Sequence, residues 1–323
     1  MIAAKSFQAA SPGKVILFGE HAVVYGRPAI AVPVTQVQAE VTVCLDAESA
    51  PGGRIISSET GLNARLDEMP SDFWGRVVVR SVCQAAGLPG SPRFTMRIRS
   101  TIPVAAGLGS GAAVATAAIR ALAAYFGLDP PAEQVNLMAF EVEKGHHGTP
   151  SGIDNTVVTY AKPVFFVRGR TLETLQVGRS FEIVIADTGV PSPTAATVAD
   201  VRTGWLREPD KFERLFDQAG DIAVQARAAI EEGHPNRLGP LMNANHAALQ
   251  AMGVSSPDID RLVATALTSG AAGAKLSGGG RGGNLIAMPG DQSAENIAQN
   301  MKRAGALRTI ITQIEKSRHD NPT

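Results

Sequence analysis

The stretch Pro103-Val-Ala-Ala-Gly107-Leu-Gly109-Ser110-Gly111-Ala-Ala113 lies between a strand-like segment and an alanine-rich helical segment. Its three glycines let the backbone adopt positive φ and approach a ligand closely. The first N–H groups of a helix have no partner within the helix, and the helix dipole favours negative charge there. The stretch therefore predicts an anion-binding loop at a helix start, of the kind that receives a phosphate group.

The segments around this loop predict a mixed architecture of helices and strands. Residues 94–100 alternate apolar and polar side chains, which indicates a half-exposed strand, and Ala112 to Phe126 has the composition of a helix that ends at Gly127. Further strands are expected at 15–18, after a turn at Ser11-Pro12-Gly13, and at 29–34 and 37–45, and a further helix at 73–86. Residues 46–72 give no clear prediction. Because helices and strands mingle without a regular βαβ repeat, we expect an α+β fold, with domains at 1–179 and 180–323.

Composition excludes several classes of protein. Apolar residues make up 44% of the 323 residues, yet no run reaches the roughly 18–20 apolar residues of a membrane span. Lys and Arg together number 30, as do Asp and Glu, so no global charge attracts nucleic acid or an anionic membrane. The N-terminal residues lack the apolar core of a signal peptide, and we expect a cytoplasmic protein that binds neither nucleic acid nor membrane.

Two common phosphate loops do not fit the glycine stretch. A Walker loop needs a lysine directly after its last glycine, and none follows here. A dinucleotide fold needs a buried strand before the loop and a second strand that ends in an acidic residue, whereas the strand before this loop is amphipathic and no strand precedes Asp129. The residues alone favour another kind of phosphate loop and leave open a loop that only turns the chain.

Three motifs in the same order resemble those of the GHMP kinase superfamily, which includes galactokinases, homoserine kinases, mevalonate kinases and phosphomevalonate kinases. They are the glycine stretch, Ser11-Pro-Gly-Lys14-Val-Ile-Leu-Phe-Gly19-Glu20-His21, and Lys275-Leu-Ser-Gly-Gly-Gly-Arg-Gly-Gly283. The resemblance implies a GHMP kinase two-domain fold. Its N-terminal domain is like ribosomal protein S5 domain 2, its C-terminal domain is ferredoxin-like, and ATP and the substrate bind in the cleft between them, with Mg²⁺ as a cofactor. The residues that it assigns to ATP are Pro103, Ala106, Gly107, Leu108, Gly109, Ser110 and Gly111.

Within the superfamily, two further segments resemble the branch that phosphorylates mevalonate. They are Gly148-Thr-Pro-Ser-Gly-Ile-Asp154-Asn155 and Asp187-Thr-Gly-Val-Pro-Ser-Pro-Thr194. The resemblance implies ATP-dependent phosphorylation of the 5-hydroxyl of mevalonate in isoprenoid biosynthesis. The alternatives are another small-alcohol kinase of the superfamily, of the phosphomevalonate or homoserine type, and a nucleotide-binding sensor without activity on the same fold. A homodimer is one assembly that the resemblance leaves open.

The resemblance also assigns the chemistry. Asp154, which by its sequence context alone is more typical of a helix N-cap, takes the role of the base that accepts the hydroxyl proton. Lys14, which in a turn before a strand is usually only solvated, would lie beside that base and the reacting oxygen. A cation there keeps the aspartate ionised and stabilises charge in the transition state.

The remaining assignments concern the metal and the substrate. Glu143 aligns with the magnesium ligand of the family, with Ser110 as its expected partner, because the second serine of the family motif is replaced here by Gly111. The substrate residues are expected to be Glu20, His21 and Thr194. The adjacent pair His146 and His147 is given no role, and Arg281, where the family usually has glycine, could reach a phosphate or point to solvent.

Overall fold

The computed structural model describes residues 5–45, 52–90, 93–103, 107–147, 151–171 and 173–317, and of His146 and His147 it describes the backbone alone. The predicted nucleotide contact Ala106 lies outside the described residues, as do the first three residues of the predicted segment 148–155. The strands are β1 (Ser6–Phe18), β2 (Ala29–Cys44), β3 (Arg54–Ser57), β4 (Leu62–Arg65), β5 (Thr95–Ser100), β6 (Val164–Phe166), β7 (Glu173–Thr174), β8 (Phe181–Asp187), β9 (Ala271–Ser277), β10 (Asn284–Pro289) and β11 (Arg308–Ile314). The α-helices are α1 (Trp74–Ala85), α2 (Ser110–Tyr125), α3 (Ala132–His147), α4 (Ile153–Tyr160), α5 (Thr194–Arg207), α6 (Pro209–Glu231), α7 (Leu238–Ala251), α8 (Pro257–Thr268) and α9 (Ala294–Arg303), with 3-10 helices η1 (Ala22–Tyr25), η2 (Leu66–Glu68) and η3 (Pro235–Arg237).

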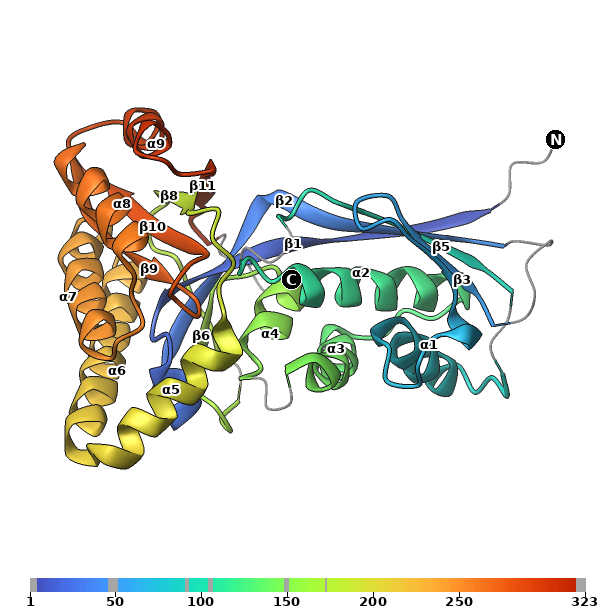
Figure 1. Ribbon diagram of the computed structural model, residues 1–323. Coiled ribbons are helices and arrows are strands. Elements are labelled where there is room, and N and C mark those ends of the chain that lie inside the picture. The colour runs from blue at the N-terminus through green and yellow to red at the C-terminus, as the bar shows by residue number, and fades with distance from the viewer. Residues whose placement is uncertain are drawn as a thin grey trace. The chain divides into compact units, whose positions relative to one another are not determined.

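The residues group into two compact units, and neither is one continuous segment. Unit 1 comprises Met1–Gly13, Val37–Pro103 and Gly109–Ala161, and unit 2 comprises Lys14–Gln36, Val104–Leu108 and Lys162–Thr323. The chain passes from one unit to the other within the long strands β1 and β2 (Figure 1). The single division after residue 179 that the sequence suggested stays a prediction for the domain boundary.

The first strand corrects one expectation. The turn predicted at Ser11-Pro12-Gly13 does not form, because β1 continues through all three residues. Pro12 has no N–H to donate, and within the described residues β1 pairs only with β2, so it is an edge strand in which proline is tolerated. The two strands expected at 29–34 and 37–45 likewise form the single strand β2.

Unit 1 packs three helices against part of one sheet. The pairing order there is β4-β3-β5-β2, with β3 parallel to β5 and the other pairs antiparallel. Val41, Ile55 and Met96 from these strands share one apolar cluster with side chains of α1, α2 and α3. All alanines of α2 except Ala124 are almost completely buried, and their small side chains let the neighbouring elements lie close to this helix.

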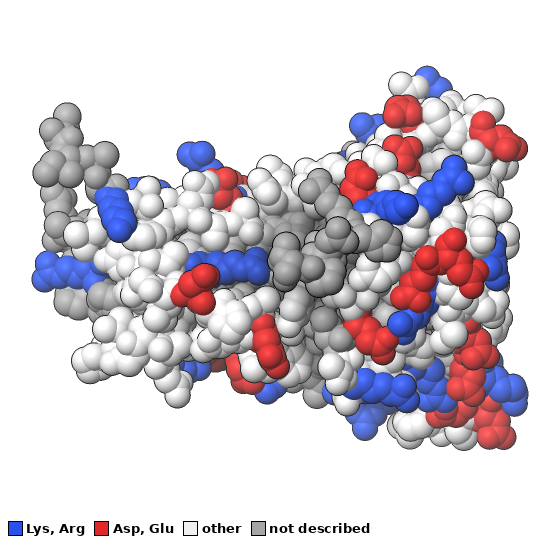
Figure 2. All heavy atoms as spheres, turned by 180° about the vertical axis from the view of Figure 1, so that it is seen from behind, with Lys and Arg blue, Asp and Glu red and all other residues white. Residues whose placement is uncertain are grey.

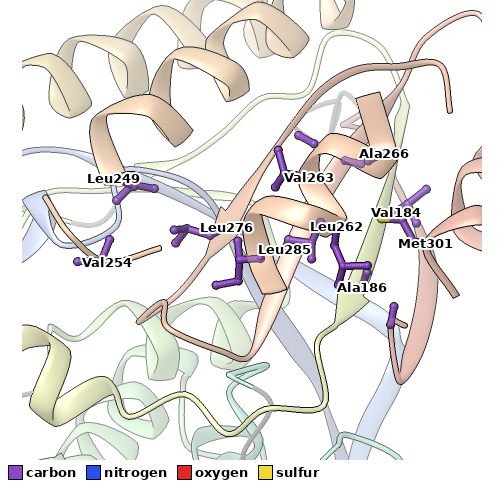
Figure 3. Close-up of a cluster of buried hydrophobic side chains, with 14 of the residues drawn as sticks. Val184, Ala186, Leu249, Val254, Leu262, Val263, Ala266, Leu276, Leu285 and Met301 are labelled. Carbon is purple, nitrogen blue, oxygen red and sulfur yellow. The ribbon is translucent and has the colours of Figure 1, made fainter. Parts of the chain in front are cut away.

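Unit 2 contains a four-stranded antiparallel sheet in the order β11-β8-β10-β9. Helices α5 to α8 connect β8 to β9, and α9 connects β10 to β11, which is the ferredoxin-like arrangement expected for the C-terminal domain. Figure 3 shows its core, in which Val184, Leu276 and Leu285 of the sheet lie near Leu262 of α8 and Met301, the last of which belongs to α9.

The charged side chains are intermingled on the surface. The face shown in Figure 2 carries Lys and Arg beside Asp and Glu, in agreement with the equal totals of 30 and 30 in the sequence. In the part of the chain that the structure describes, no helix is long and apolar enough to cross a membrane.

Candidate active site

The predicted phosphate loop has the backbone that its glycines were expected to allow. Gly107 and Gly109 have φ of 75° and 72°, a left-handed conformation that other residues rarely adopt. Gly109 is the N-cap of α2 and brings no side chain to the first turn, so no capping side chain occupies its N–H groups. Ser110, the first residue of α2, is half-buried and Gly111 is exposed. This helix start can therefore receive an anion.

A carboxylate lies beside the first turn of α2. Glu143 of α3 is buried, and a Cβ built on Gly111 would lie 3.6 Å from its Oε1 atom. That distance is ordinary van der Waals contact, so a side chain at position 111 would touch the carboxylate. The structure thus places position 111, where the family motif has its second serine, beside Glu143, while a metal ion held by Glu143 and Ser110 stays a prediction. Within the described residues, no group of three or more His, Cys, Asp or Glu side chains could hold a metal ion.

Asp154 lies in the first turn of α4 and is half-buried. The N-cap of α4 is Gly152, with φ of 88°, so the alternative in which Asp154 is the N-cap residue is wrong. The preceding glycine lets the chain turn sharply into the helix, which fixes the backbone that carries the carboxylate.

His21 and Thr194 lie against one point of unit 2, the backbone of Gly279, and Glu20 directly precedes His21 in the chain. His21 Nε2 lies 3.1 Å from the carbonyl oxygen of Gly279. A Cβ on Gly279 would clash with Oγ1 of Thr194, at the start of α5, so only glycine fits at this position. The three predicted substrate residues therefore belong to one cluster.

His21 is buried in an uncommon backbone conformation. Its φ is 60°, in the left-handed region that non-glycine residues adopt only where the surrounding structure enforces it. Burial lowers the pKa of His21 from its ordinary value of 6.5 to about 4. The ring is neutral at pH 7, and we infer that Nε2 donates to the Gly279 carbonyl, which leaves Nδ1 as the acceptor nitrogen.

Sequence reasoning missed Lys275, the partner of Glu20. Lys275 is fully buried in β9, where its ammonium group forms a short ion pair with Glu20 Oε1 and donates to the Leu276 carbonyl at 2.6 Å. Burial raises the pKa of Glu20, while the charges of Lys275 and, to a smaller extent, Lys14 oppose that rise. Burial likewise lowers the pKa of Lys275. The available signal was a lysine inside the apolar strand sequence Ala274-Lys275-Leu276.

Lys14 is buried in β1, and its backbone N–H donates to the carbonyl of Leu108 at 3.0 Å. This bond ties the first motif to the phosphate loop. The effect of its charge on Glu20 places it near the substrate cluster of unit 2. Its pairing with Asp154 stays a prediction.

Arg281 is engaged in structural contacts. Its guanidinium group pairs with Asp200 and donates to the carbonyl of Gly253 at 3.1 and 3.2 Å, while its backbone N–H donates to Val254. Of the two roles left open by the sequence, binding of a phosphate is the less compatible with these bonds, because the donors already hold the turn after α7.

Two families match parts of the chain. Residues 74–162 match the family described as GHMP kinases N terminal domain, and residues 226–307 match GHMP kinases C terminal. The mevalonate kinase of Thermococcus sibiricus is 36% identical over 95% of this chain and 96% of its own length. The chain therefore belongs to the GHMP kinases.

Two further relatives that cover most of the chain are mevalonate kinases. That of Methanothermobacter thermautotrophicus is 35% identical over 86% of this chain and 89% of its own. The crystal structure of L. major mevalonate kinase in complex with R-mevalonate is 30% identical, covers 98% of both chains and has a TM-score of 0.84.

Proposed function

We propose that the chain is a mevalonate kinase, which transfers the γ-phosphoryl group of ATP to the 5-hydroxyl of mevalonate and so serves isoprenoid biosynthesis. The observation that carries this proposal is similarity over nearly the full chain to mevalonate kinases, one of which was solved with R-mevalonate bound. In the reaction, the 5-oxygen forms a bond to Pγ, the bond from Pγ to the β,γ-bridging oxygen breaks, and ADP leaves.

The start of α2 supplies the nucleotide site. Backbone N–H groups at Gly109, Ser110 and Gly111 would donate to phosphate oxygens, and the positive end of the helix dipole would stabilise their charge. Gly107 and Leu108 would complete the loop, together with Pro103 and Ala106 as the sequence predicts.

Glu143 and Ser110 fit a Mg²⁺ ion that binds together with ATP. A hard cation prefers oxygen ligands, and Mg²⁺ commonly takes one or two from protein and the rest from phosphates and water. The buried carboxylate beside the first turn of α2 matches this need. When bound, the ion would neutralise charge on the transferring phosphoryl group.

Asp154 would accept the proton of the 5-hydroxyl, and Lys14 would stabilise the negative charge that develops on the reacting oxygens. Phosphoryl transfer requires little covalent chemistry from the protein, so positioning and charge stabilisation account for most of the rate enhancement. A general base of this kind typically contributes about 10²–10⁴-fold.

The Glu20, His21 and Thr194 cluster would hold mevalonate, whose two hydroxyl groups and carboxylate call for polar partners. The neutral ring of His21 can accept a hydrogen bond from a hydroxyl at Nδ1 while Nε2 holds Gly279. The Thr194 hydroxyl, which lies against Gly279, can donate or accept.

The experiment is a coupled ADP-release assay of the purified chain with mevalonate, phosphomevalonate, homoserine and galactose. We expect kcat/KM for mevalonate to exceed that for each other alcohol by at least about 100-fold, since mismatched polar groups in a binding site are strongly rejected. Preference for another alcohol would assign the chain to that kinase, and ATP binding without turnover on any alcohol would favour the sensor.

A cytoplasmic location and a homodimer remain predictions of the sequence. Light scattering of the purified chain at several concentrations measures its oligomeric state directly.

A further inference from the structure

The short helix that carries Asp154 is tied to its two neighbours by buried polar side chains. Asn155, on α4, is 2% exposed and donates from Nδ2 to Oδ1 of Asn136, on α3, at 2.7 Å. Asn136 in turn donates to Oγ1 of Thr156 at 3.4 Å. Both contacts join the first turn of α4 to the second turn of α3.

The other end of α4 is held by α2. The hydroxyl groups of Thr159 and Thr116 lie 3.3 Å apart in the interior, and Arg120 donates to the Thr159 carbonyl at 2.5 Å. Since α4 has only eight residues, these bonds engage both of its ends. Figure 1 shows α4 beside α2 and α3, with which it is in contact.

The two partner helices carry the other parts of the proposed site. Asn136 precedes Glu143 by seven residues of α3, about two helical turns, so both lie on one face of the helix. Thr116 and Arg120 belong to α2, whose first turn forms the phosphate loop. The polar contacts of α4 therefore lead to the metal carboxylate on one side and to the nucleotide loop on the other.

Polar contacts fix a helix in a way that apolar contacts do not. Apolar burial is non-directional, whereas a hydrogen bond requires a defined distance and direction between its donor and its acceptor. An amide left buried without a partner is costly, so a rotation of α4 that separates Asn155 from Asn136 is strongly opposed.

We propose that Asn136 and Asn155 are positioning residues that hold the carboxylate of Asp154 in a fixed register to that of Glu143. This role rests on the proposed function, because it presumes that the two carboxylates serve as base and metal ligand. It predicts that the amide pair acts on turnover beyond its contribution to stability.

The experiment compares Asn136→Leu, Asn155→Leu and the double variant with Val135→Ala, which truncates a buried apolar side chain of the same helix. Thermal midpoint, kcat and both KM values are measured for each. Each single variant should lower kcat at least about tenfold while KM for ATP and mevalonate changes less than about threefold. In the double variant the midpoint should recover relative to the single variants, because replacing both polar partners removes the unpaired group, but kcat should stay low.

A purely structural role gives a different result. The positioning role is wrong if kcat recovers together with the thermal midpoint in the double variant. It is also wrong if Val135→Ala lowers kcat as much as the asparagine variants do at an equal loss of thermal midpoint. Thr116→Val is a milder variant for the case in which a leucine variant does not fold, because it removes one hydroxyl contact with little change of volume. It too should lower kcat without a matching fall in the thermal midpoint. The wild type is assayed first with mevalonate: an inactive wild type contradicts the proposed function, whereas an active wild type with unaffected variants contradicts the positioning role alone.

Discussion

At the residue scale, His21 of the substrate cluster makes the stability of the folded chain depend on pH. Its pKa is about 4 in the folded chain and about 6.5 when exposed, so the folded state disfavours protonation. The stability that comes from the lowered pKa of His21 is fully present above pH 6.5. It is lost as the pH falls from 6.5 towards 4, because His21 binds a proton in the unfolded chain before it does so in the folded chain.

We expect the His21→Gln variant to lose less stability in acid than the wild type. Between pH 7 and pH 4, the free energy of unfolding of the wild type should fall by up to roughly 3 kcal/mol more than that of the variant. Urea unfolding of both proteins at several pH values measures this difference. The pKa of His246 is also lowered by burial, but His246 is present in both proteins and cancels. Equal pH dependence of the two proteins would contradict the assigned pKa.

Glu20 and Lys275 are a second pair of buried groups whose loss can be measured. Lys275→Met leaves the Glu20 carboxylate buried without its cation, and breaking such a pair typically destabilises a protein by about 3–5 kcal/mol. The double variant Glu20→Gln with Lys275→Met should regain a large part of that loss. A denaturant double-mutant cycle measures the coupling, and additive losses would show that the two groups do not interact.

Gly111 is the position at which the chain departs from its family motif, and it lies against Glu143. We expect Glu143→Ala to raise the Mg²⁺ concentration for half-maximal activity at least about tenfold, since the ion loses its carboxylate ligand. Gly111→Ser should lower that concentration by about twofold or more, because a hydroxyl joins the carboxylate. Gly111→Ala is the matched control, which adds the Cβ alone. A Mg²⁺ dependence that is the same in all four proteins would contradict the metal site.

At the element scale, the segment that carries Glu20 and His21 is docked on one face of α6. The Tyr25 ring stacks on Phe216 with centroids 4.1 Å apart. The guanidinium group of Arg27 donates to Asp217 at 2.8 and 3.0 Å and pairs with Glu213. These contacts hold the loop in which His21 keeps its strained φ.

We expect Arg27→Met to raise KM for mevalonate about three- to tenfold while KM for ATP stays near that of the wild type, since only the substrate segment is loosened. Steady-state kinetics with each substrate varied in turn measure this. Lys211→Met, which removes an exposed cation paired with Glu208 on the same helix, is the control and should change neither value. Equal changes in both KM values for Arg27→Met would contradict a local effect.

Elements with strong local patterns could be predicted from the sequence. The alanine-rich helix after the glycine loop and the helix at 73–86 formed close to their expected bounds, as α2 and α1. The turn at Pro12 was wrong because pairing with β2 outweighs the local preference of Ser-Pro-Gly for a turn. Residues 46–72, unassigned from the sequence, include β3 and β4. These two strands pair with each other, and β3 also pairs with β5, which lies far away in the chain.

Candidate site residues could be named from the sequence where a motif is contiguous, and their roles stay predictions. Glu20 and His21 were named from one segment, and the structure places His21 and Thr194 against the same residue, Gly279. Lys275 could not be named as the partner of Glu20, because 255 residues separate them and only the fold joins them. The amide pair of Asn136 and Asn155 gave no signal for the same reason: each is an ordinary polar residue until two helices pack.

At the scale of the whole molecule, the residues assigned from the sequence are divided between the two compact units. Lys14, Glu20, His21 and Thr194 belong to unit 2, and Ser110, Glu143 and Asp154 belong to unit 1. The chain passes between the units directly before Lys14 and again between Leu108 and Gly109. Two of the motifs that define the family therefore contain these crossings, and similarity to mevalonate kinases extends over both units.

The central claim is that Asp154 and Lys14 carry out phosphoryl transfer to mevalonate, and turnover of Asp154→Ala and Lys14→Met tests it most directly. The rate of ADP release and the rate at which phosphorylated mevalonate forms, the latter followed by ³¹P NMR, should both fall about 10²–10⁴-fold in each variant. The thermal midpoint and the ATP affinity of each variant should stay close to those of the wild type. Turnover within about threefold of the wild type in either variant would contradict the assignment of that residue.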